Sequence, residues 1–148
     1  VINVNDIERW GSIGFNFRYT DIQASIAIEH LKGIDTRINN LKNVYDTYVK
    51  NLNTDKFIPI LVNIQQGEIP LYNEYLIKNR YKIIKKLSNN NIQTRAFYPD
   101  INTAKYFNSV KLKFKNSIQF HKYGVFMPGG PNQSIKNIKH VINKILDK

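Results

Sequence analysis

The residues with the clearest capacity for chemistry are Asn16 and Arg18, which lie just before a predicted helix. In an extended segment, residues two apart share a face, so these two side chains point the same way. Thr20 and Gln23 have the spacing of a capping box, which predicts that the helix begins directly after Thr20. An amide, a guanidinium and a helix N-terminus together are suited to hold a phosphate or a carboxylate.

A plainer interpretation of the same residues is structural. Arg18 can pair with the nearby acid Asp21, and Asn16 can satisfy a turn. Exposed ion pairs are common and contribute little stability, so residue chemistry alone favours this interpretation over an anion clamp. Both interpretations stay open at this point.

The composition is that of a folded domain. The chain has 148 residues, with 42% hydrophobic and 12% aromatic side chains, which is enough to bury a core. It has no cysteine, which excludes disulfides, thiolate chemistry and cysteine-bound zinc. No apolar run approaches the roughly 20 residues that span a bilayer, and no leader pattern is visible. We therefore expect a cytoplasmic protein without a membrane segment.

The net charge of +11 raises the question of a nucleic-acid partner. The lysines are spread through every segment among many asparagines and isoleucines, whereas nucleic-acid binders concentrate basic residues on one stripe. The densest cluster, Lys82, Lys85 and Lys86, is most simply the solvated face of a helix. The charge alone therefore does not indicate nucleic-acid binding, and a basic binding module for nucleic acid or acidic partners remains an alternative.

Hydrophobic periodicity and breaker residues predict an α/β (α+β) fold: a small domain with a long bent N-terminal helix and a three-stranded sheet packed by helices. The helix is interrupted at Gly33 and then carries apolar residues at steps of three and four up to Leu52. We expect residues 1–13 to be a linker from a missing large domain and residues 14–148 to be the domain itself. The remaining expected elements are strands at 57–64, 92–98 and 123–127, helices at 72–87 and 116–122, an irregular stretch at 100–115, and a last helix capped by Ser134.

Tests for self-contained catalysis are negative. The three histidines, His30, His121 and His140, lack metal-ligand spacing, and no nucleophile elbow or phosphate-binding glycine loop is present. Asp100 is the only carboxylate beside the Phe97–Pro99 segment, so paired-carboxylate chemistry has no support. The chain alone therefore does not read as a complete enzyme, and we expect no metal.

Three motifs resemble the DegT/DnrJ-type sugar aminotransferases, which are pyridoxal-phosphate enzymes of the aspartate-aminotransferase fold. Residues 14–24 (GFNFRYTDIQA) resemble the family's helix-start motif. Residues 92–101 (IQTRAFYPDI) resemble its Thr-Arg strand and Tyr-Pro end, and residues 126–128 (FMP), followed by Ser134, resemble its closing turn and helix.

The resemblance implies that the chain is the carboxy-terminal (small) domain of a longer homodimeric transaminase. It implies transfer of an amine, with glutamate as donor, to a keto nucleotide sugar in amino-sugar or polysaccharide biosynthesis. The cofactor lysine would lie upstream, so this chain would carry no catalytic residue of its own. Asn16 and Arg18 match family positions that reach the cofactor phosphate of the partner subunit, and Tyr98 would face the substrate. A non-catalytic fragment that keeps only the fold and the dimer seam is the further alternative.

Overall fold

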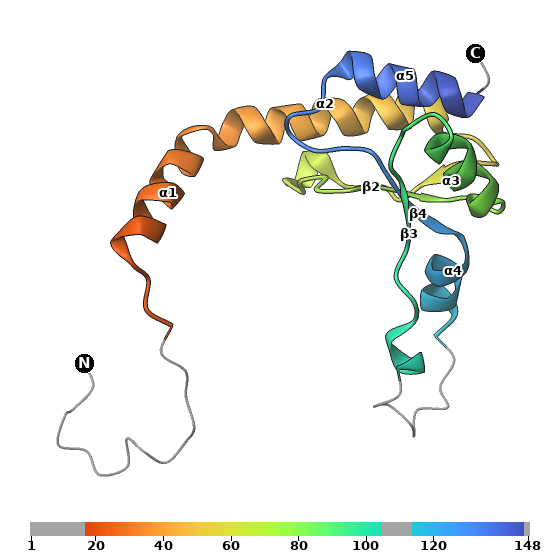
Figure 1. Ribbon diagram of the computed structural model, residues 1–148, viewed down its shortest axis with the longest axis horizontal. Coiled ribbons are helices and arrows are strands. Elements are labelled where there is room, and N and C mark those ends of the chain that lie inside the picture. The colour runs from red at the N-terminus through yellow and green to blue at the C-terminus, as the bar shows by residue number, and fades with distance from the viewer. Residues whose placement is uncertain (1–16, 105–113, 147–148) are drawn as a thin grey trace, which may run out of the picture. The chain divides into compact units, whose positions relative to one another are not determined.

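The computed structural model describes residues 17–104 and 114–146 (Figure 1). It divides into two compact units, Val1–Ile34 and Asp35–Lys148. Asn16 and the predicted linker at 1–13 lie outside the described residues, as does most of the irregular stretch at 100–115. The expected domain boundary after residue 13 therefore stays a prediction.

The described part of the first unit contains one helix, α1 (Asp21–Lys32). The predicted capping box is confirmed: the Gln23 amide donates to the Thr20 hydroxyl over 3.3 Å, and the Thr20 amide donates to the Gln23 side chain over 2.9 Å. These bonds satisfy amides that would otherwise be free at the helix start. Within this unit α1 buries none of its residues, and its large apolar side chains are exposed, including Ile22, Ile26, Ile28 and Leu31.

The second helix, α2 (Ile34–Leu52), follows the predicted interruption at Gly33. Its predicted apolar stripe is confirmed in its C-terminal two thirds, where five residues are buried against the rest of the second unit. The start of the stripe is less buried, and Ile34 is 44% exposed. The buried residues are Leu41, Val44, Tyr45, Tyr48 and Leu52.

In the described part of the chain the sheet has four strands rather than the three predicted from the sequence. The strands are β1 (Ile58–Pro59), β2 (Asn73–Leu76), β3 (Arg95–Ala96) and β4 (Gly124–Met127), and they lie antiparallel in the order β1-β2-β4-β3. The two edge strands are much shorter than predicted.

The strand missed from the sequence is β2, because residues 72–87 were predicted to form one helix. In the structure Asn73 and Tyr75 are buried while the residues between and after them are half-buried, which is the period of a strand. The helix α3 (Arg80–Ser88) begins only afterwards. The prediction failed because Tyr75, Ile83 and Leu87 also fit a helical spacing, and pairing of β2 with β4 decided the outcome.

The other predicted helices are confirmed as α4 (Lys115–Tyr123) and α5 (Ile135–Leu146). The Ser134 hydroxyl accepts from the Asn137 amide over 3.1 Å, as expected for a cap. Two short 3₁₀ turns, Ile64–Gln66 and Ile101–Thr103, complete the fold. In Figure 1, α2 and α5 lie together on one side of the sheet.

The hydrophobic core lies between those helices and the sheet. Buried residues of α2, α5 and α3 meet inward-facing residues of β2 and β4 in one cluster. This burial is the main source of stability, at roughly 1.5–3 kcal/mol for each large apolar side chain. The central members are Val44, Tyr48, Leu52, Tyr75, Leu87, Val125, Met127, Ile138 and Ile142.

Two tyrosines place hydroxyl groups inside this core. The rings of Tyr48 and Tyr75 are 6.3 Å apart and pack edge to face, and both side chains are at most 2% exposed. Neither hydroxyl has a hydrogen-bond partner within the described residues. Burial raises the pKa of both phenols above the ordinary value of 10.0, because the charged phenolate loses its hydration.

We predict that Tyr48→Phe changes the pH dependence of stability more than stability itself. In the wild type the pKa of this phenol is higher in the folded chain than in the unfolded one. The free energy of unfolding is therefore unaffected by ionisation below about pH 10, and it falls as the pH rises further, because the unfolded chain ionises first. The variant should unfold at the same urea concentration or a slightly higher one at pH 7, since no hydrogen bond is lost. Above pH 10 its free energy of unfolding should fall less steeply. Tyr72→Phe, at a residue that is 61% exposed, is the control, and equal alkaline slopes for all three proteins would contradict the prediction.

Candidate functional site

A row of side chains crosses the face of the sheet that α2 and α5 leave open. The strand register pairs Phe126 of β4 with Glu74 of β2 on one side and with Arg95 of β3 on the other. Alternate residues of a strand face opposite ways, so Phe126 points away from the core that contains Val125 and Met127. Neighbouring strands are about 4.8 Å apart, so the backbones of Glu74 and Arg95 are roughly 10 Å apart.

Arg95 is exposed, yet its guanidinium is held by two aromatic rings. Its central carbon lies 4.7 Å from the centre of the Tyr98 ring and 5.0 Å from the centre of the Phe126 ring. Its Nη2 also donates a hydrogen bond of 2.7 Å to the Tyr98 hydroxyl. Cation–π contacts of this kind contribute about 0.5–1 kcal/mol each at exposed sites.

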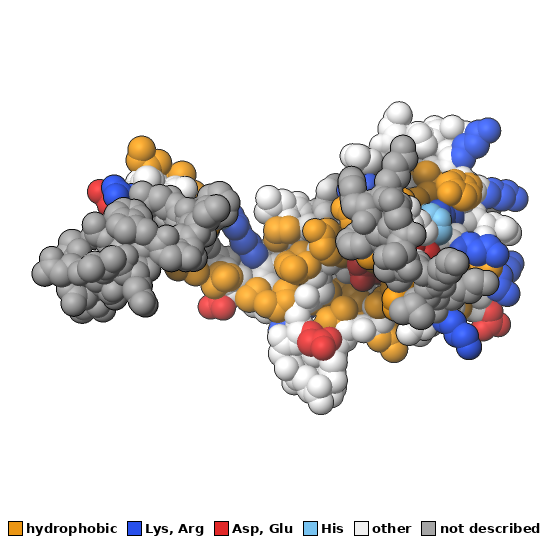
Figure 2. Space-filling model, turned by 90° about the horizontal axis from the view of Figure 1, so that it is seen from below, with side chains coloured by type: hydrophobic (Ala, Val, Ile, Leu, Met, Phe, Trp, Pro, Cys, Tyr) orange, Lys and Arg blue, Asp and Glu red, His pale blue; other side chains and the backbone are white. Residues whose placement is uncertain are grey.

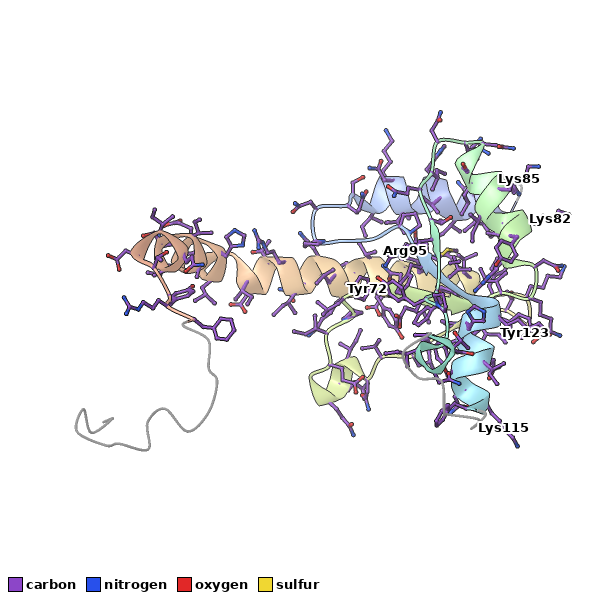
Figure 3. The ribbon with its side chains drawn as sticks, turned by 60° about the horizontal axis from the view of Figure 1, so that its bottom comes forward. Tyr72, Lys82, Lys85, Arg95, Lys115 and Tyr123 are labelled. Carbon is purple, nitrogen blue, oxygen red and sulfur yellow. The ribbon has the colours of Figure 1, made fainter. Side chains whose placement is uncertain are left out.

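The rings beneath Arg95 are themselves packed. Phe97 stacks on Phe126 at 4.6 Å with the ring planes 10° apart. Tyr72 and Tyr98 meet Phe126 edge to face at 5.4 and 5.9 Å. Figure 3 labels Tyr72 and Arg95 where β2, β3 and β4 come together. The guanidinium therefore rests on a preassembled aromatic support.

Glu74 adds a carboxyl group to the same face. Partial burial raises its pKa above the ordinary value of 4.5, because the carboxylate loses hydration. An acidic side chain with a raised pKa can accept a hydrogen bond from a hydroxyl or an ammonium group, or donate one when it is protonated. The open face thus presents a cation and an acid on either side of an aromatic ring.

A hydrogen bond fixes the segment that follows β3. The Ser117 hydroxyl of α4 donates to the Asp100 carboxylate over 2.5 Å. This bond ties the chain just after Tyr98 to α4, so the Tyr98 ring is anchored at its C-terminal side as well. Asp100 therefore has a structural contact that holds this segment in place.

The arrangement is suited to bind a planar or tetrahedral anion. A guanidinium has five N–H donors, and the bond to Tyr98 uses one of them. The others can meet carboxylate or phosphate oxygens, and the aromatic support holds their direction before a ligand arrives. Tyr72 and Tyr98, which are 61% and 59% exposed, offer ring surface beside the cation for a sugar or a base.

The residues predicted from the sequence fall in different places. Tyr98 belongs to the Arg95 cluster. Arg18 is exposed in the first unit, two residues before the N-cap Thr20, and Asn16 lies outside the described residues. The anion-binding role of Arg18 and its pairing with Asp21 both stay predictions.

Arg95 is the residue of the candidate site to which the sequence analysis assigns no role. The family resemblance includes the Thr-Arg strand but gives its arginine no role. The available signal was the alternation that puts Arg95 and Phe97 on one face of the strand. Phe126 also supports the guanidinium, but it lies on β4, far from Arg95 in the sequence. Nothing in the sequence near Arg95 indicates that contact.

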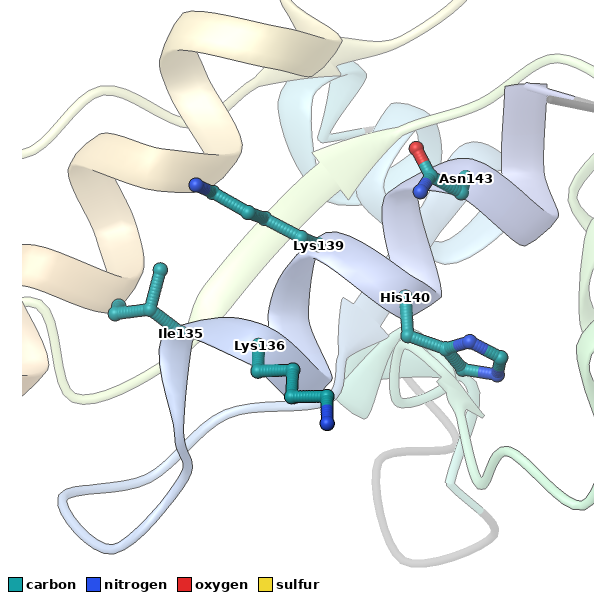
Figure 4. Close-up of a pocket in the computed structure, with 5 residues that line it drawn as sticks. All are labelled: Ile135, Lys136, Lys139, His140 and Asn143. Atoms are coloured by element: carbon teal, nitrogen blue, oxygen red, sulfur yellow. The ribbon is translucent and has the colours of Figure 1, made fainter.

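Two other surface features are weaker candidates for a binding site. Five residues of α5 line an open hollow, but they all come from one helix, and Figure 4 shows Lys139 and His140 extending in opposite directions. Lys and Arg side chains gather toward one edge of the face in Figure 2, and Lys82 and Lys85 of α3 are labelled in Figure 3. Neither feature includes a buried polar group that would define a ligand.

Within residues 17–104 and 114–146, no helix has the length and apolar content needed to cross a bilayer. The same residues contain no group of three or more histidines and acids placed to hold a metal ion.

The fold is that of the sugar aminotransferases. Sugar aminotransferase CalS13 from Micromonospora echinospora matches with a TM-score of 0.80 at 16% identity, over 90% of this chain and 37% of that chain. The structure of an Escherichia coli GDP-4-keto-6-deoxy-D-mannose-3-dehydratase with bound hydrated pyridoxal phosphate matches with a TM-score of 0.69 at 17% identity, over 89% of this chain and 36% of that chain.

Residues 3–146 match the DegT/DnrJ/EryC1/StrS aminotransferase family, and the chain belongs to it. Among curated proteins, an Escherichia coli GDP-perosamine synthase is 22% identical over 141 residues. That match covers 90% of this chain and 37% of the relative, so the chain spans little more than a third of the relative's length. The family resemblance and the mixed α/β fold expected from the sequence are confirmed.

We predict that Arg95→Met weakens binding of inorganic pyrophosphate to the chain about tenfold, because charge-assisted hydrogen bonds to the guanidinium are lost. Chemical shifts of the Tyr98 and Phe126 amides, followed by NMR during a pyrophosphate titration, report binding at this place. Arg37→Met, which removes the same charge from α2, is the matched control and should leave those titrations unchanged. Equal affinities for wild type and Arg95→Met would contradict the assignment.

Proposed function

We propose that this chain is the carboxy-terminal part of a pyridoxal-phosphate-dependent aminotransferase that acts on a keto nucleotide sugar, with glutamate as the amino donor. Family membership over nearly the whole chain supports the reaction class. The observation that carries the substrate side of the proposal is Arg95, which is held on Tyr98 and Phe126 and, among the described residues, keeps N–H donors for an anion. Nucleotide sugars and glutamate are both anionic.

Substrate names of the relatives support the same class. The curated relative is a synthase of GDP-perosamine, and one matching structure is a dehydratase of a GDP-linked keto sugar. In our proposal Arg95 binds an anionic oxygen of the substrate, Tyr98 and Tyr72 flank the ligand, and Glu74 accepts from a sugar hydroxyl. These residues bind and orient the substrate. The chemical steps of the reaction are carried out by groups elsewhere in the protein.

Pyridoxal phosphate supplies the electron sink for amino-group transfer when it is bound. The residues of this chain that fit its phosphate are Arg18 and Asn16. Arg18 is exposed and stands two residues before a helix start with a complete capping box, which is chemistry suited to a dianion. We propose that both side chains grip the cofactor phosphate bound by the partner subunit of a homodimer.

The exposed apolar side chains of α1 support a partner surface. Ile22 is 75% exposed and Leu31 is 61% exposed, and α1 has no buried residue within the described unit. Exposed apolar patches of this kind typify interaction surfaces. We propose that the remainder of the aminotransferase dimer covers them, and that the protein works in the cytoplasm, where nucleotide sugars are available.

The proposal predicts that the product of the complete gene binds pyridoxal phosphate and transfers an amine from glutamate to a GDP-linked 4-keto sugar. Arg18→Ala and Asn16→Ala should each weaken cofactor binding, about tenfold for Arg18, because an arginine–phosphate bond is lost. Absorbance of the bound cofactor during titration measures this affinity. Arg37→Ala is the control, and sedimentation should show that all variants remain dimers.

Two results would contradict the proposal. A complete product without cofactor absorbance after pyridoxal phosphate is added would support the non-catalytic alternative. Nucleic-acid binding with a steep salt dependence, in the absence of transamination, would support the basic binding module instead.

A further inference from the structure

Arg80 is a buried cation without an acidic partner. It is the first residue of α3 and is only 4% exposed. Within the described residues no carboxylate lies within ion-pair distance of it. A position at the N-terminus of a helix is also unfavourable for positive charge. Burial of a charged side chain under these conditions is costly unless its hydrogen bonds are specific.

Its hydrogen bonds join three elements. Nη1 donates to the carbonyl oxygen of His121 near the end of α4 and, over 3.2 Å, to that of Gly124 at the start of β4. Nη2 donates to the Tyr81 hydroxyl over 2.9 Å. Carbonyls at the C-terminus of a helix carry partial negative charge, so α4 provides the compensation that a carboxylate would otherwise give.

Gly124 connects Arg80 to the strand of the candidate site. Its carbonyl oxygen also accepts from the Phe97 amide over 2.9 Å. A Cβ at Gly124 would lie 2.7 Å from the Cβ of Phe97 and 2.5 Å from the Phe120 carbonyl oxygen, so the close approach requires glycine. Arg80 and Phe97 therefore donate to one and the same oxygen.

From Phe97 the connection reaches Arg95 directly. The Phe97 ring stacks on Phe126 at 4.6 Å, and Phe126 supports the Arg95 guanidinium at 5.0 Å. We infer that Arg80 is a positioning residue. By donating to the Gly124 carbonyl oxygen, it holds the position of Phe97 and thereby the orientation of Arg95. This inference rests on the proposed role of Arg95 in binding substrate.

A purely stabilising role explains Arg80 less well. Even a complete buried ion pair is often replaced by apolar residues without loss of stability, so burial of a charge is weak evidence for a stabilising role. The Nε of Arg80 is buried without a partner within the described residues, which is a further cost. The donors of Arg80 converge on carbonyl oxygens of α4 and β4. An apolar side chain could not make these hydrogen bonds.

The test compares Arg80→Met with Lys82→Met in the 148-residue chain, because both remove one positive charge from α3 and insert the same side chain. For Arg80→Met we expect hydrogen exchange of the Phe97 amide to be about tenfold faster. We also expect the Arg95 side-chain protons to lose their ring-current shifts and the affinity for inorganic pyrophosphate to fall about fivefold. The thermal midpoint should stay within about 5 °C of the wild type.

Unchanged Arg95 shifts and pyrophosphate affinity in a folded Arg80→Met chain would overturn the inference. Should that variant fail to fold, Arg80→Gln, which keeps N–H donors, takes its place; unfolding of both would show that Arg80 serves the fold as a whole and would equally overturn it. These readouts need neither pyridoxal phosphate nor turnover, so failure of the proposed transaminase activity would be seen separately in the complete protein.

Discussion

The candidate site depends on the contact between a guanidinium and the faces of two aromatic rings. A free arginine side chain at a surface samples many conformations and carries about 2 kcal/mol of rotamer entropy. Packing of Arg95 against Tyr98 and Phe126 removes much of that freedom before a ligand binds. Preorganisation of this kind improves affinity because less freedom is lost in the complex.

The fold supplies that contact by using the two faces of one sheet differently. Tyr75, Val125 and Met127 face α2 and α5 and form the core. The intervening residue Phe126 must then face outward, where it meets Arg95 across the ladder. Packing of the core therefore also holds Phe126 in place beneath Arg95. A one-residue slip in strand register would exchange the residues on the two faces.

Local sequence signals predicted the helices well. The Thr20–Gln23 capping box, the apolar spacing up to Leu52 and the Ser134 cap all act through residues close in the chain, and each is found in the structure. The strand β2 was missed because Tyr75 and Leu87 also fit a helical face, and only pairing with β4 distinguishes the two. The contact of Arg95 with Phe126 was missed for the same reason, since Phe126 belongs to another strand. The roles of Asn16 and Arg18 remain predictions.

The most direct measurement is a crystal structure of the complete protein with GDP or a GDP-linked sugar bound. The account predicts that an Arg95 nitrogen lies within about 3 Å of an anionic oxygen of the ligand, while the guanidinium still rests on Phe126 and Tyr98. A ligand bound elsewhere, with Arg95 facing solvent or paired with an acidic side chain of the same protein, would contradict it.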